Sequence, residues 1–118
     1  MTRKEINKLD KIFREVINER DNGTCQYCGG PGNNVHHLIG RRNRSVRWYP
    51  DNLILLCSGC HTFRTNSFHQ DPLETTAWFV ANYPQRYAQV MDRKNKILKQ
   101  TYEEVPIVTG KQIGRAHV

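Results

Sequence analysis

The chain has 118 residues, a length that indicates one domain with a modest hydrophobic core. It carries 18 basic and 11 acidic side chains, which give a formal net charge of +7. No apolar run is long enough to span a bilayer and the N-terminus does not resemble a secretory signal, so the sequence excludes a membrane protein and indicates a cytoplasmic one.

The positive charge is concentrated in the middle of the chain. Residues 25–69 contain five arginines and a single acid, Asp51, whereas basic and acidic groups nearly balance in residues 1–24 and 70–110. A local cationic field of this kind suits a polyanion such as nucleic acid. Taken alone, the charge excess is equally compatible with a solvated basic surface.

The N-terminal segment, residues 1–24, has the pattern of a packing helix. Thr2 and Glu5 have the spacing of a capping box, and Asn22-Gly23 provides a stop signal. Apolar residues recur between them at helical spacing: Ile6, Leu9, Phe13, Val16 and Ile17.

The segment 25–69 reads as a small cysteine- and histidine-rich core. Residues 35–39 and 52–56 have the composition of short strands, and a basic loop over 40–50 joins them. A short helix is expected to begin at about residues 60–65.

Two helices are expected in residues 70–100. Asp71 and Pro72 open the first, whose apolar side is assigned to Trp78, Phe79 and Val80, and Pro84 separates it from the second. The second helix carries the following apolar residues: Tyr87, Val90, Met91, Ile97 and Leu98.

Residues 101–118 are expected to form a flexible tail. Within it, residues 112–118 resemble a translated sequencing adapter rather than native sequence, so His117 is assigned no function.

Four cysteines form two pairs, Cys25/Cys28 and Cys57/Cys60, each with a two-residue gap. This spacing lets both thiolates of a pair reach one ion, and two pairs complete a tetrahedral structural Zn²⁺ site. A disulfide framework is the competing interpretation, but a reducing compartment favours zinc. The long interval between the pairs leaves room for a hairpin that contains the histidines.

All histidines outside the tail lie between positions 36 and 69. Hydrolysis of a phosphodiester needs a cation on the phosphate and a group that activates water, and neutral imidazole can ligate the one or act as the other. The adjacent pair His36-His37, followed by Asn52 and His61, therefore indicates an active site. His69 is a third metal ligand, a phosphate contact or a surface histidine.

The order of these motifs resembles the HNH endonuclease family, which has the ββα-metal fold. The resemblance covers about residues 25–65 and is carried by the two cysteine pairs, Val35-His36-His37-Leu38, Asp51-Asn52-Leu53 and the Cys60-His61 step. Residues 37–42, 47–48 and 50–52 also resemble phage HNH proteins, including recombination proteins of the NinG type. The expected fold is α+β, with a ββα-metal core and a four-cysteine zinc site between flanking helices.

The resemblance also implies roles for individual residues. His36 and His61 would hold a catalytic divalent ion (Mg²⁺, Mn²⁺, Ni²⁺ or Zn²⁺), His37 would be the general base, and Asn52 would orient His37 by bonding across the hairpin. Adjacent side chains on a regular strand point to opposite faces, so His36 and His37 serve one phosphate only through a twist or bulge, or from different sides. An irregular hairpin is therefore expected at His36-His37.

The basic loop is expected to contact the substrate. Arg41, Arg42, Arg44 and Arg47 are placed to clamp DNA phosphates, while Trp48 either stacks on bases or packs against the zinc site. The sequence thus predicts a metal-dependent DNA endonuclease that acts in the host cytoplasm if it is phage-encoded. It leaves the oligomeric state open and favours a monomer, since it shows no dimer signature. The alternatives are a non-catalytic zinc-stabilised module that binds nucleic acid and a zinc ribbon that mediates protein contacts.

Overall fold

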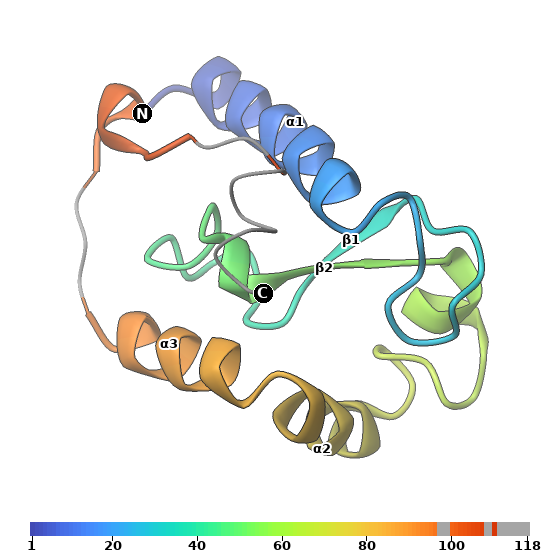
Figure 1. The fold of residues 1–118 in the computed structure, drawn as a ribbon. Coiled ribbons are helices and arrows are strands. Elements are labelled where there is room, and N and C mark those ends of the chain that lie inside the picture. Colours follow the sequence, from blue (N-terminus) through green and yellow to red (C-terminus); the bar gives the residue numbers. More distant parts are fainter. Residues whose placement is uncertain (97–99, 108–109, 111–118) are drawn as a thin grey trace.

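A two-stranded antiparallel hairpin lies between α1 on one side and α2 and α3 on the other (Figure 1). The computed structural model describes residues 1–96, 100–107 and 110. The helices and strands are α1 (Arg3–Arg20), β1 (Asn34–His37), β2 (Leu53–Leu56), α2 (Pro72–Asn82) and α3 (Pro84–Lys94). Short helical turns occupy Pro50–Asn52, Gly59–Phe63 and Tyr102–Glu104. This mixture of helices and a small sheet confirms the predicted α+β class.

The capping box predicted for α1 is present. The Glu5 amide donates to Thr2 Oγ1 at 3.1 Å, and the Thr2 amide donates to Glu5 Oε1 at 2.8 Å. The helix ends where Asn22 and Gly23 adopt left-handed backbone angles, with φ of 57° and 62°. The five apolar residues predicted to face the core are all buried.

The hairpin is regular through the two histidines, so the expectation of an irregular hairpin is wrong. His36 pairs with Ile54 and His37 with Leu53, without a bulge. Regular alternation places the two imidazoles on opposite faces of β1. The two rings therefore leave β1 on different sides, as the alternative arrangement requires.

Alternation along β2 divides the core into two clusters, one on each face of the hairpin. Leu53 and Leu55 pack with the buried face of α1, whereas Ile54 and Leu56 pack with the zinc-site cysteines, Phe68 and Phe79. Trp48 is buried in the cluster on α1, so it packs in the core, though not against the zinc site. Each face of this small sheet is thereby covered, as an isolated two-stranded hairpin requires.

Two arginines attach the helices to the start of β2. Arg20, at the end of α1, donates to the Leu53 carbonyl at 2.6 Å, and Arg86 of α3 donates to the same oxygen at 2.7 Å. Asp21 pairs with Arg20 at 2.8 Å and accepts a hydrogen bond from the Leu55 amide at 3.0 Å. These bonds fix the hairpin relative to both flanking helices.

The C-terminal helices begin as predicted, with Asp71 capping α2 and Pro84 opening α3. Val80, however, is exposed, because consecutive helical residues lie about 100° apart and cannot all face the core. Ile97, Leu98 and residues 111–118 lie outside the described residues. In the segment assigned to a flexible tail, Val105 is buried against α1. No helix in the described part of the chain has both the length and the apolar character needed to cross a membrane.

Candidate metal centres and the cavity beside them

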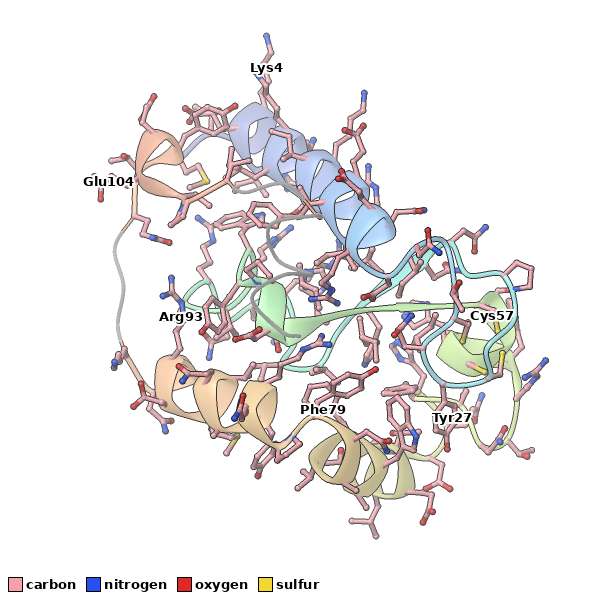
Figure 2. The ribbon with its side chains drawn as sticks, in the orientation of Figure 1. Lys4, Tyr27, Cys57, Phe79, Arg93 and Glu104 are labelled. Atoms are coloured by element: carbon pink, nitrogen blue, oxygen red, sulfur yellow. The ribbon has the colours of Figure 1, made fainter. Side chains whose placement is uncertain are left out.

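The four cysteines gather at one end of the hairpin, where Figure 2 shows sulfur atoms beside Cys57. Their thiols are unpaired, and all four sulfur atoms lie within 4.8 Å of one another. The Sγ atoms of Cys28 and Cys57 are 3.8 Å apart. A zinc–sulfur bond of about 2.3 Å gives a tetrahedral edge of about 3.8 Å, so the site has the dimensions of a structural zinc centre.

Backbone amides and one arginine surround these sulfur atoms. A hydrogen bond from the Gly30 amide is the main reason that the pKa of Cys28 is lowered to about 6. The Cys60 amide likewise donates to Cys57 Sγ at 3.4 Å and lowers the pKa of that thiol. Arg64 donates to Cys60 Sγ at 3.4 Å. Burial raises the pKa of Cys60 despite this contact, whereas the donors to Cys28 and Cys57 favour thiolates, the form that binds zinc.

A second cluster consists of three histidines. Nitrogen atoms of His36, His61 and His69 lie within 4.8 Å of one another, and the Nε2 atoms of His61 and His69 are 3.1 Å apart. Metal–nitrogen bonds of about 2.0–2.1 Å place two tetrahedral ligands about 3.3 Å apart, so this spacing suits a shared cation. Burial, followed by the two neighbouring imidazoles, lowers the pKa of His36 to about 3 and keeps it neutral.

The backbone explains why His69 joins this cluster. The π-helical turn Gly59–Phe63 carries His61, and the chain then returns alongside it. Phe68 N donates to Cys60 O at 2.8 Å, and His69 N donates to His61 O at 3.2 Å. The sequence left three roles open for His69: metal ligand, phosphate contact or surface residue. The structure places its ring beside the rings of His36 and His61, as the first role requires. The sequence carries no signal for this return, because it depends on pairing within an irregular loop.

His37 lies on the opposite face of β1, toward α1. Its Nε2 is 3.1 Å from the carbonyl oxygen of Arg47. Since a carbonyl only accepts, Nε2 carries the proton and the Nδ1 lone pair is left to act as a base. Burial is the main cause that lowers the pKa of His37 to about 4, so the ring is neutral at physiological pH.

Asn52 does not contact His37 in the way that was expected. Its side-chain oxygen accepts from Ile39 N at 2.7 Å, and its nitrogen donates to the carbonyls of Ile39 and Val46 at 3.0 Å each. The fully buried amide therefore ties the start of the basic loop to Val46 within it. It supports His37 only indirectly, through the loop that supplies the Arg47 carbonyl.

Replacing Asn52 with alanine should destabilise the protein by about 2–4 kcal/mol, because three backbone groups in buried or partly buried hydrogen bonds lose their partner. Urea unfolding would measure this free energy. Asn82→Ala is the matched control, since the exposed Asn82 side chain makes one bond to a helix carbonyl and should change stability by less than about 0.5 kcal/mol. Equal stability of the two variants would contradict the assignment.

The four arginines predicted to bind DNA separate into two groups. Arg41, Arg42 and Arg44 are exposed. Arg47 instead forms an ion pair with Asp10 of α1 at 2.7 Å, and its side chain is largely buried. Three positive side chains of the loop are therefore presented to solvent, and the fourth is engaged in holding the loop on α1.

His37 and the three-histidine cluster line one cavity of about 430 Å³. The cavity thus extends around the edge of β1. Arg41 lines it from the basic loop, and three residues of α1 line it as well: Asp10, Phe13 and Arg14. The sequence did not point to Asp10 and Arg14 as residues of the site. Their spacing of four residues places them on one face of α1, near Phe13, and this is the only pattern in the sequence that marks them.

Residues 25–67 match the family model of the HNH endonuclease. Residues 25–67 therefore form a domain of the HNH type with a small ββα-metal core, and the predicted resemblance of this segment to HNH endonucleases is confirmed. The resemblance to phage proteins of the NinG type stays a prediction. A domain of this type indicates a nuclease or nucleic-acid-binding function and metal binding. No curated protein and no solved structure gave a significant match to the chain.

Proposed function

We propose that the protein is a metal-dependent endonuclease that hydrolyses phosphodiester bonds of DNA, with His37 as the general base. The observation that carries this proposal is the shared cavity, which His37 enters from one face of β1 and the three-histidine cluster from the other. A non-catalytic zinc module that only binds nucleic acid would not require these two kinds of imidazole in one cavity.

Hydrolysis would proceed in one step without a covalent enzyme intermediate. His37 Nδ1 takes a proton from water, whose oxygen attacks phosphorus in line with the departing 3′ oxygen. The bond from phosphorus to that oxygen breaks, and the oxygen takes a proton from solvent. The products carry a 5′-phosphate and a 3′-hydroxyl group.

His36, His61 and His69 would hold the catalytic divalent ion. A cation bound there supplies positive charge next to the phosphate as negative charge develops on it. Three neutral imidazoles favour transition-metal ions, above all Ni²⁺ or Zn²⁺ and to a lesser degree Mn²⁺, over Mg²⁺. Arg41, exposed and lining the same cavity, would attract the phosphate and keep it near His37.

Nicking of supercoiled plasmid should require an added divalent ion, and His61→Ala should raise the ion concentration needed by at least about tenfold. The assay compares Mg²⁺, Mn²⁺, Ni²⁺ and Zn²⁺ on protein that retains its structural zinc. Thr65→Ala is the matched control, because Thr65 is an exposed residue of the loop between His61 and His69. Binding of the plasmid without cleavage under every ion would favour the non-catalytic alternative.

A further inference from the structure

The tautomer of His37 depends on where one backbone carbonyl lies. That carbonyl belongs to Arg47, in a loop built from turns rather than from a helix or strand. Because Nε2 donates to this oxygen, a displaced carbonyl would release the ring to rotate or to carry its proton on Nδ1. Whatever fixes Arg47 therefore fixes the orientation of the proposed base.

Asp10 binds the side chains of Arg47 and of the residue after it. Its two carboxylate oxygens accept from Arg47 Nε at 3.1 Å and from Nη2 at 2.7 Å, a bidentate pair. Oδ1 also accepts from Trp48 Nε1 at 2.9 Å. The peptide unit that carries the Arg47 carbonyl joins these two residues, so Asp10 restrains that unit through the side chains on both sides of it.

The surroundings of this carboxylate make the contact more than a surface ion pair. The side chains of Arg47 and Asp10 are only 16% and 13% exposed, which limits screening by solvent. Asp10 lies in the middle of α1, next to the buried residue Leu9 and one turn before the buried residue Phe13. Burial alone would raise the pKa of Asp10, but the hydrogen bonds from Arg47 and Trp48 outweigh burial and lower it.

Other contacts hold the rest of the loop and would keep it in place without Asp10. Asn52 donates to the Val46 carbonyl at 3.0 Å. Asn43 donates to the carbonyl of Lys94 at the end of α3, and Arg93 of α3 donates to the Ser45 carbonyl at 2.7 Å; Figure 2 shows Arg93 on this helix. Loss of Asp10 should therefore loosen residues 47 and 48 without detaching residues 43–46.

We infer that Asp10 is a positioning residue, which fixes the Arg47 carbonyl and through it the orientation and tautomer of His37. This inference rests on the proposed function for the role of His37 in catalysis. It extends the active site beyond residues 25–67, the segment that matches the family model, and makes α1 a part of the machinery. The cavity agrees, since Asp10 lines it together with His37.

The test compares Asp10→Ala and Asp10→Asn with Glu15→Ala, which removes an exposed acid from the same helix. In Asp10→Ala, kcat for plasmid nicking should fall about 10- to 100-fold, while KM and zinc content stay within about twofold. Asp10→Asn keeps an oxygen acceptor for Trp48 and should recover part of the lost kcat. Glu15→Ala should cleave like the wild type.

Nitrogen NMR of the histidine rings provides a readout that does not depend on cleavage. In the zinc-loaded wild type, His37 should show a proton on Nε2 alone, whereas Asp10→Ala should show a mixture of both tautomers. A wild-type kcat or an unchanged His37 tautomer in Asp10→Ala would overturn the inference. If the wild type does not cleave, the proposed function fails, and the tautomer in Asp10→Ala still decides whether Asp10 positions the ring.

Discussion

Cys60→Ser is expected to release the structural zinc and unfold the segment 25–69. Cys60 is buried in the same cluster as Ile54 and Leu56, so an ion held by this thiol would also stabilise the hydrophobic core. Structural zinc contributes on the order of 10–16 kcal/mol of binding free energy in small peptides. The whole stability of a domain is about 5–15 kcal/mol, so loss of the ion exceeds what the remaining contacts can offset.

Circular dichroism and zinc content measured on the same sample would show this unfolding. Ser58→Ala is the matched control, because Ser58 is exposed in the same turn between Cys57 and Cys60 and should leave both signals unchanged. Removal of zinc from the wild type by a chelator should reproduce the serine variant. A cooperatively folded Cys60→Ser protein without zinc would show that the helices and hairpin are stable alone.

Local patterns predicted the parts of the fold that depend on neighbours in sequence. The Thr2–Glu5 capping box and the helical spacing of Leu9 and Phe13 are properties of one helix, and the structure has both. The two cysteine pairs likewise encode their own turns, and their sulfur atoms meet at the predicted site. In each case the residues that decide the structure are within a few positions of one another, or share a metal.

Features that arise from docking between distant segments were not predicted. Asp10 reaches Arg47 only because the apolar face of α1 packs on the hairpin, and no local pattern marks that contact. Asn52 was expected to bond to His37, yet its amide forms hydrogen bonds with backbone groups of Ile39 and Val46. A buried amide satisfies whichever backbone groups surround it, and those groups are known only from the folded loop.

The opposite orientations of His36 and His37 follow from the regular strand that holds them. His36 contacts Phe68 and the other two histidines of the second cluster, whereas His37 faces the Arg47 carbonyl. Simple alternation thus separates the proposed metal ligand from the proposed general base, although they are adjacent in sequence. The two proposed roles can therefore be removed one at a time by substitution.

His37→Ala is expected to lower plasmid cleavage by about 10²- to 10⁴-fold, the usual contribution of a general base. Folding should persist, because the zinc-site cysteines and the cluster of Ile54 and Leu56 lie on the other face of the hairpin. The three-histidine cluster also remains, so binding of the divalent ion should be retained. The variant should therefore bind DNA and the ion but fail to cut.

The decisive comparison sets His37→Ala beside His61→Ala in the same nicking assay. Raising the ion concentration should restore part of the activity of His61→Ala, whose defect is in metal affinity, and none of the activity of His37→Ala. Added imidazole should restore part of the activity of His37→Ala and none of the activity of His61→Ala, since it can enter the 430 Å³ cavity and replace the missing base. Undiminished cleavage by His37→Ala would remove His37 from this role, and a defect cured by more metal would assign it to ion binding instead.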